Sequence, residues 1–130
     1  LMRLQRREHY RISTPVIKPL RCLLPELLDR NGIMIEFRVV DISCGGLAMV
    51  TNASQIHVDL GQKFDVSQIE LPSIGMVTAG LIIRSITEIP DSMVMQGQRC
   101  GCQFINLPGT MITLIQRYIN SLQRERRALS

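Results

Sequence analysis

The sequence predicts an all-β domain with one helix at its C-terminal end, folded as a small antiparallel barrel or sandwich. Six or so strand-like runs recur at short, even spacing and are separated by turn residues. The hydrophobic repeat changes from every second residue to the helical period only near the C-terminus. The chain has 130 residues, of which 45% are hydrophobic, so it can form one well-packed core.

The first extended run covers residues 16–24. Pro15 and Pro19 place it at a sheet edge or a strand entry, because proline cannot donate to a central ladder. Asn31-Gly32 follows, and this dipeptide is the strongest short signal for a hairpin turn. The sequence therefore predicts a tight turn into the next strand.

That next strand is predicted at residues 33–42, where alternation is typical of a half-buried strand. Strict alternation places Val39 and Asp41 on the same face. The tripeptide at 44–46 (Cys-Gly-Gly) breaks the run, and residues 47–50 form another strand. The break predicts a tight loop between neighbouring strands.

Three further strands complete the β region. Residues 64–71 alternate with a predicted bulge, and a turn at 72–75 follows. The long β-branched run 76–89 contains Gly80, which predicts a bulge or bend. Residues 98–106 form the last strand.

A helix is predicted at residues 110–127, with Thr110 as its N-cap. Its apolar positions recur at helical spacing and are Met111, Leu114, Ile115, Tyr118, Ile119 and Leu122. Arg124, Arg126 and Arg127 fall in the predicted last turn, where cations oppose the negative end of the helix dipole.

The positive charge is concentrated at the two ends of the chain. The formal net charge is +4, but residues 1–21 carry +5, residues 117–130 carry +3, and the stretch between them carries −4. Thirteen of the 15 basic residues are arginine, which forms bidentate contacts with phosphate or a purine edge. This distribution indicates an anionic partner held by a terminal segment, because the acidic body offers no basic stripe for a nucleic acid.

The remaining composition argues against several classes of site. The four cysteines lie in apolar or glycine-rich runs without a C-x-x-C pair, so we expect no metal site and a reducing, cytoplasmic setting. No apolar run reaches the roughly 18 residues of a membrane span. His9 has no third group to orient it as a base for Ser43 or Cys44, so we expect no catalytic residues and no enzyme.

Two short motifs carry the functional signal. Arg7 and Arg11 form R-x-x-x-R, and two guanidiniums at this spacing can hold one compact anion. Asp41, Ser43 and Gly46 form D-x-S-x-x-G, in which the carboxylate can accept hydrogen bonds from a purine edge. Gly46 would permit close backbone approach or a positive φ. Each motif alone is also explained by ordinary solvated charge or by strand-end turn chemistry.

Taken together, with about 30 residues between them, the two motifs make the chain resemble a PilZ domain. The resemblance extends through Gly101-Cys102-Gln103-Phe104 and the C-terminal helix, and is to the C-terminal domain of YcgR-type flagellar brake proteins. It implies a six-stranded antiparallel β-barrel at 14–107, an arginine-rich arm at 1–13 and a helix at 110–127 packed on the barrel.

The resemblance also implies a receptor for cyclic di-GMP. In the family, the two arginines of the arm contact phosphate and guanine, and here these are Arg7 and Arg11. The aspartate and serine contact guanine, and here these are Asp41 and Ser43, with Gly46 completing the turn. Arg6, just before the pair, predicts cation–π stacking on guanine and two nucleotides per domain.

The expected mechanism is an ordering of the arm by the ligand. Clamping the arm would reorient a domain expected upstream of Leu1, and flagellar motor or basal body proteins would read the change. Tyr10 is expected to anchor the arm on the barrel rather than stack on a base. The alternatives are a basic nucleic-acid-binding barrel and a PilZ domain that only binds proteins.

Overall fold

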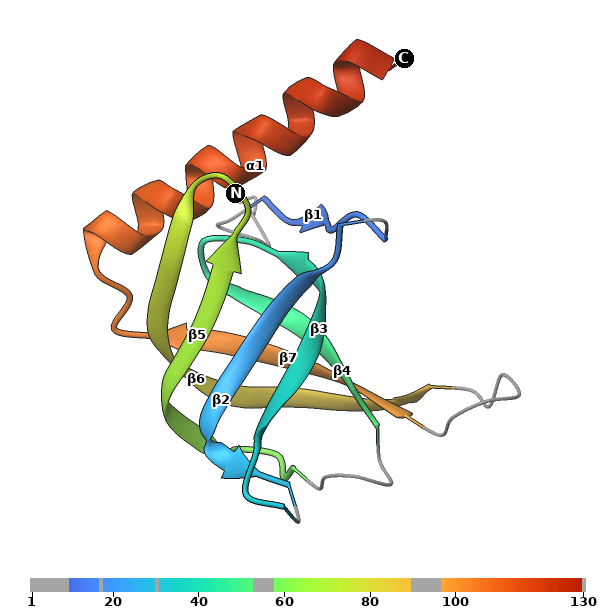
Figure 1. Ribbon diagram of the computed structural model, residues 1–130, viewed down its shortest axis with the longest axis vertical. Coiled ribbons are helices and arrows are strands. Elements are labelled where there is room, and N and C mark those ends of the chain that lie inside the picture. Colours follow the sequence, from blue (N-terminus) through green and yellow to red (C-terminus); the bar gives the residue numbers. More distant parts are fainter. Residues whose placement is uncertain (1–9, 17, 30, 53–57, 90–96, 130) are drawn as a thin grey trace, which may run out of the picture.

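The computed structural model describes residues 10–16, 18–29, 31–52, 58–89 and 97–129. Its strands are β1 (Ile12–Ser13), β2 (Leu20–Leu28), β3 (Met34–Ile42), β4 (Gly46–Asn52), β5 (Lys63–Leu71), β6 (Gly75–Ile89) and β7 (Gly97–Ile105). A single helix in these ranges, α1 (Gly109–Leu129), follows the last strand. Figure 1 shows the strands wrapped into a barrel with α1 at one end.

All strand pairs are antiparallel, and six strands close the barrel. The hydrogen-bonded order runs β3-β2-β5-β6-β7-β4, and β4 pairs back with β3. β1 is an additional short strand beside β3. The predicted six-stranded antiparallel barrel with a C-terminal helix is therefore confirmed.

The hairpin between β2 and β3 forms where Asn31-Gly32 predicts it. Gly32 has a φ of 78°, which glycine adopts at no steric cost. The Asp29 carboxylate accepts hydrogen bonds from the backbone N–H groups of Asn31 at 2.8 Å and Ile33 at 3.0 Å. This side chain therefore closes the turn through local chemistry that needs no distant contact.

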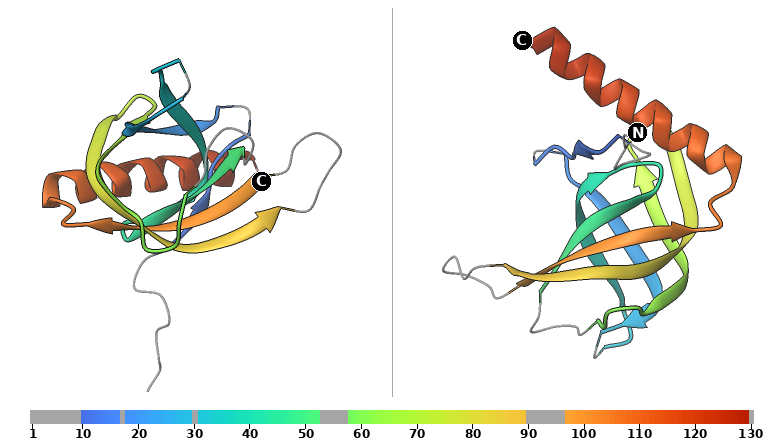
Figure 2. Two further views of the ribbon diagram at one scale, coloured as in Figure 1. Left: turned by 90° about the horizontal axis from the view of Figure 1, so that it is seen from below. Right: turned by 180° about the vertical axis from the view of Figure 1, so that it is seen from behind.

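α1 covers one open end of the barrel, as both views in Figure 2 show. Its buried side chains are Ile115, Tyr118, Ile119 and Leu122, and they pack on the barrel core. The predicted helical stripe is thus confirmed. The predicted cap is wrong, because the helix begins at Gly109 and the Pro108 carbonyl accepts from Met111 and Ile112.

The other helix boundary also differs from its prediction. α1 continues to Leu129, so only Arg126 and Arg127 of the three arginines lie in the last turn. Arg124 lies earlier and, with Arg117, lines a groove against the β5–β6 turn. The hydrophobic pattern predicts which face of the helix is buried. It does not predict where the helix ends, because the last turn is exposed to solvent.

A bulge in β3 changes which residues face the core. Val39 pairs with Met49 of β4, but Asp41 pairs with Ala48, so Val40 is one residue more than the register allows. Val39 and Ile42 are fully buried, whereas Asp41 lies at the surface of the barrel wall. The prediction that Val39 and Asp41 share a face is therefore wrong. Bulges re-aim side chains in this way and are common beside functional sites.

The four cysteines, Cys22, Cys44, Cys100 and Cys102, are free thiols. Burial raises the pKa of Cys22 to about 12. Burial, with smaller contributions from Cys100 and Cys22, raises the pKa of Cys102 to about 12. Both side chains therefore belong to the apolar core.

Candidate functional site

β1 brings the arm of the chain to the D-x-S-x-x-G motif. Ile12 pairs with Ile42, and Ser13 pairs with Asp41. β1 and β2 follow the same side of β3, because β4 occupies the other side. The chain leaves this ladder between them, in the segment that contains Pro15 and Pro19.

Thr14 fastens the end of β1 to the bulged part of β3. Its buried hydroxyl donates to the Val39 carbonyl at 2.5 Å, and its backbone N–H donates to the Val40 carbonyl at 3.0 Å. Ile12 is only 3% exposed. The last residues of the predicted arm, Ile12 and Ser13, are therefore part of the sheet.

Arg11 lies directly before β1 and is exposed. Ile12 pairs antiparallel with Ile42, so Arg11 and Ser43 follow this pair at the same end of the ladder. The structure thus brings three predicted site residues, Arg11, Asp41 and Ser43, to one edge of the barrel. The other two arginines of the predicted site, Arg6 and Arg7, lie outside the described residues.

The Asp41 carboxylate has two oxygens in different environments. Oδ2 accepts a hydrogen bond from the Arg99 Nη2 at 2.7 Å, and this ion pair joins β3 to β7 across β4. Oδ1 is buried and has no hydrogen-bond partner among the described residues. The Asp41 side chain is 15% exposed and that of Arg99 is 45% exposed. Within the described part of the chain, the site therefore holds one buried acceptor without a donor, which is uncommon in folded proteins.

Ser43 organises the loop between β3 and β4. Its Oγ accepts from the backbone N–H of Gly45 at 3.1 Å and of Gly46 at 3.3 Å. Its own N–H donates to the Gly46 carbonyl at 2.8 Å. Ser43 is only 4% exposed, so in this structure its hydroxyl serves the turn.

Gly46 is required by close backbone approach rather than by a positive φ. A Cβ atom on Gly46 would lie 2.0 Å from the Cys102 carbonyl oxygen of β7. The neighbouring Gly45 carbonyl accepts from the Phe104 N–H at 2.9 Å. Of the two predicted reasons for this glycine, the structure shows the close approach.

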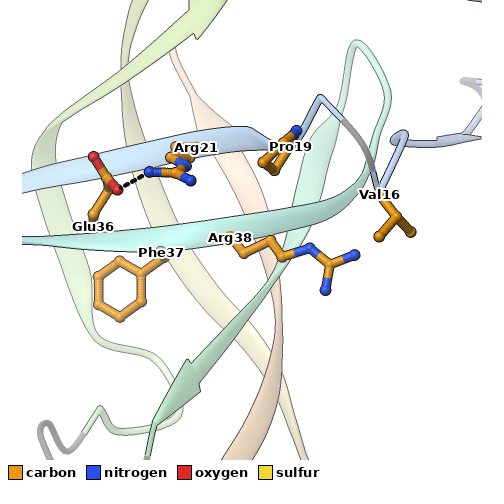
Figure 3. Close-up of a pocket in the computed structure, with 6 residues that line it drawn as sticks. All are labelled: Val16, Pro19, Arg21, Glu36, Phe37 and Arg38. Carbon is orange, nitrogen blue, oxygen red and sulfur yellow. Dashed lines mark hydrogen bonds and ion pairs between the residues drawn. The ribbon is translucent and has the colours of Figure 1, made fainter.

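A groove of about 410 Å³ lies on the outer face of β2 and β3, beside the segment that links β1 to β2. Its lining residues are Val16, Pro19, Arg21, Glu36, Phe37 and Arg38. Figure 3 shows the Arg38 side chain extending towards Val16, while Arg21 is paired with Glu36 at 2.6 Å. Arg38 therefore adds positive charge to the same wall that carries Asp41.

Tyr10 does not have the role predicted for it. Its side chain is 62% exposed, so it is not an anchor in the barrel core. The core beneath this end of the barrel is already filled by α1 and by Ile12. The sequence alone does not show whether Tyr10 or the side chains of α1 and Ile12 fill this part of the core.

Two residues at the site were missed by the sequence prediction. Arg99 alternates with the buried Cys100 in β7, so the sequence indicates that it faces outward, but not that it meets Asp41. Arg126 donates a hydrogen bond to the Ser13 carbonyl of β1. From the sequence, Arg126 is expected only to oppose the negative end of the helix dipole. Both contacts join distant parts of the chain, and no local pattern predicts them.

The described ranges contain no group of three His, Cys, Asp or Glu side chains that could hold a metal ion. Among the same residues, no helix has the length and apolarity of a membrane span. His9, which lies between Arg7 and Arg11 in the sequence, is outside the described residues. The charged side chains Arg11, Asp41 and Arg99 can form charge-assisted hydrogen bonds.

Comparison with known protein families gives a match that covers both motifs. A family model for the PilZ domain matches residues 5–121. The chain belongs to the PilZ family. This confirms the predicted resemblance, and the PilZ match includes both motifs and most of α1.

Curated PilZ relatives carry the name flagellar brake protein YcgR. The relative from Nitrosospira multiformis is 33% identical over 132 residues, covering 100% of this chain and 51% of the relative. The relative from Azoarcus sp. is 35% identical over 129 residues, covering 98% of this chain and 50% of the relative. The chain therefore spans about half the length of these curated relatives.

Solved structures support the same fold. The PilZ domain of YcgR from Escherichia coli, determined with c-di-GMP, is 27% identical and has a TM-score of 0.75. That match covers 95% of this chain and 96% of the solved domain. MrkH from K. pneumonia, in complex with c-di-GMP, has a TM-score of 0.78 at 21% identity, covering 98% of this chain and 57% of that chain, and supports the fold alone.

Proposed function

We propose that this PilZ domain is a cyclic di-GMP receptor that binds the nucleotide between its N-terminal arm and the β3–β4 edge of the barrel. One observation supports this most strongly. The pairing of Ser13 with Asp41 brings the end of the arginine-rich arm against the D-x-S-x-x-G motif. The solved YcgR PilZ domain with c-di-GMP, which has the same fold, supports the choice of ligand.

The two sides of the proposed site match the two chemistries of the ligand. Guanine presents a ring N–H and an exocyclic amine, and the free Oδ1 of Asp41 is an acceptor for such donors. The phosphates are anionic, and Arg11 offers an exposed guanidinium beside the same loop. Arg6 and Arg7 are proposed to complete the clamp, on the strength of the family motif in the sequence.

Ser43 and Gly46 are proposed to shape the surface under the nucleotide. The Ser43 hydroxyl holds the loop N–H groups, and Gly46 lets β4 approach β7. These contacts determine the position of the β3–β4 loop next to Asp41. In the ligand complex, Ser43 would in addition lie beside the bound guanine.

Ligand binding would order the arm and transmit a signal along it. Residues 1–9 contain Arg3, Arg6 and Arg7, whose charges repel one another until an anion bridges them to the barrel. The charge-assisted hydrogen bonds would offset the chain entropy lost on ordering. Because the curated relatives are about twice as long, we propose that the arm joins an upstream domain and reorients it.

The proposed outcome is regulation of flagellar motility in the cytoplasm, through flagellar motor or basal body proteins, as the name flagellar brake protein suggests for the relatives. We further propose two cyclic di-GMP molecules per domain, with Arg6 stacking on a guanine face. The proposal assigns the chain no catalytic step. Calorimetric stoichiometry near one nucleotide per chain would reject the two-molecule arrangement.

Calorimetric titration of the chain with cyclic di-GMP tests the proposed site. Arg11→Ala and Asp41→Ala should each weaken binding by at least about tenfold, because each removes a charge-assisted contact. Arg84→Ala is the matched control, since Arg84 is exposed and, within the described residues, hydrogen-bonds the uncharged Gln103 side chain at 2.7 Å. Equal affinities for all four proteins would reject the site. Salt-sensitive binding to DNA or RNA without nucleotide binding would favour a nucleic-acid barrel instead.

A further inference from the structure

We propose that Arg99 is a positioning residue that orients Asp41 and gives the site its preference for guanine. The inference deepens the proposed function and rests on cyclic di-GMP binding at the β3–β4 edge. Arg99 belongs to neither sequence motif, and it lies 58 positions from Asp41 in the chain. Arg99 reaches Asp41 because β3 and β7 both pair with β4 in the barrel.

Among the described residues, one oxygen of the Asp41 carboxylate has a hydrogen-bond donor and the other has none. Arg99 holds Oδ2 at 2.7 Å, whereas the buried Oδ1 has no donor in the described structure. A charge-assisted hydrogen bond at one oxygen restricts the rotation of the carboxylate, so the direction of the other oxygen is restricted as well. A ligand that reaches this buried acceptor would therefore meet it in a restricted range of orientations.

The ion pair between Arg99 and Asp41 also reduces the electrostatic repulsion between Asp41 and an anionic ligand. Cyclic di-GMP carries two phosphates, and an unpaired Asp41 carboxylate would repel them as they approach. The Arg99 side chain is 45% exposed and contacts the Asp41 carboxylate at 2.7 Å, so its positive charge compensates the negative charge of the carboxylate. The Asp41 carboxylate can then accept hydrogen bonds from an uncharged guanine edge. The Arg99 charge reduces the repulsion between this carboxylate and the phosphates of the ligand.

This arrangement discriminates between bases by hydrogen-bond polarity. Guanine places two donors, its ring N–H and its exocyclic amine, side by side on one edge. On the corresponding edge of adenine, the ring nitrogen is an acceptor, which a carboxylate held in a fixed orientation would repel. Without Arg99, Asp41 can rotate away from the mismatched base, so the discrimination should decrease.

The test compares the wild-type chain with Arg99→Ala, Asp41→Ala and the double variant, with Arg84→Ala as the matched control. Affinities for cyclic di-GMP and cyclic di-AMP are measured for each protein by calorimetry. Arg99→Ala should weaken cyclic di-GMP binding by about tenfold and reduce the ratio of the two affinities. In the Asp41→Ala background, removing Arg99 should have little further effect, because a positioning residue acts through its partner.

Two results would overturn the inference. Unchanged cyclic di-GMP affinity and unchanged base preference in Arg99→Ala would show that the ion pair has no role in binding. The same loss in both backgrounds would show that Arg99 acts on the ligand directly, without Asp41.

A measurement without nucleotide separates this inference from the proposed function. Three-bond couplings of the Asp41 side chain, measured by NMR, should show one rotamer in the wild type and averaging in Arg99→Ala. Unchanged couplings would overturn the positioning role. If the wild-type chain shows a single Asp41 rotamer but does not bind cyclic di-GMP, the proposed function is rejected instead.

Discussion

Arg126, in the last turn of α1, donates a hydrogen bond to the backbone carbonyl of Ser13 in β1. Ser13 is also the residue that pairs with Asp41 of β3. The C-terminal helix, the short strand after the arm and the candidate ligand-binding edge are therefore joined through two consecutive contacts. Figure 1 shows β1 and α1 together at the same end of the barrel.

This contact predicts that the helix end stabilises β1. Arg126→Ala should increase amide hydrogen exchange in Ile12, Ser13 and Thr14, because β1 has only two paired residues and loses its contact with α1. Hydrogen exchange measured by mass spectrometry or NMR provides the readout. Arg124→Ala, on the same helix and exposed, is the control and should leave these amides unchanged. Equal exchange in the wild type and Arg126→Ala would contradict the coupling.

The close approach at Gly46 predicts a large cost for the smallest side chain. Gly46→Ala places a Cβ 2.0 Å from the Cys102 carbonyl oxygen, so β4 and β7 must separate. We expect a loss of roughly 3 kcal/mol or more in the free energy of unfolding, measured by urea denaturation. Gly109→Ala, where nothing lies within 4 Å of the added atom, should be neutral or slightly stabilising. A Gly46→Ala variant as stable as the wild type would show that the two strands are not held at this distance.

The buried thiols predict a loss of stability at alkaline pH. Burial raises the pKa of Cys22 and Cys102 from 9.0 to about 12, so both stay protonated in the folded chain while the unfolded chain loses their protons. Their contribution is full below pH 9.0 and is lost as the pH rises towards 12. Urea denaturation should show a fall on the order of 4 kcal/mol in the free energy of unfolding between about pH 8 and pH 10.5.

A double variant isolates this effect from other alkaline titrations. Cys22→Ala with Cys102→Ala removes both thiols, so its free energy of unfolding should vary less with pH over the same range. The variant is expected to be less stable at every pH, because it leaves cavities in the core. An equally steep pH dependence in the two proteins would mean that the thiols are not the titrating groups.

Local patterns in the sequence predicted much of the fold. Asn31-Gly32 predicted the β2–β3 hairpin because the turn is closed by its own residues. The helical spacing from Met111 to Leu122 predicted the buried face of α1 because burial and periodicity follow the same geometry. In both cases, the determining interactions lie within a few residues of one another.

The site depends on features that local patterns do not encode. The extra residue Val40 re-aims Asp41, but the strand sequence alone reads as regular alternation. Arg99 meets Asp41 only through the order of strands in the closed barrel. The two motifs predicted the candidate site residues and the proposed ligand, whereas the tertiary structure determines how the Asp41 side chain is oriented.

The most direct test of the proposed site is a titration of the isotopically labelled chain with cyclic di-GMP, followed by backbone NMR. We predict saturable shift changes centred on residues 11–13, on the β3–β4 loop from Asp41 to Gly46, and on Arg99, and their loss in Asp41→Ala. Shift changes confined to the groove of α1 near Arg117 and Arg124, or no changes at saturating nucleotide, would contradict the proposed cyclic di-GMP site.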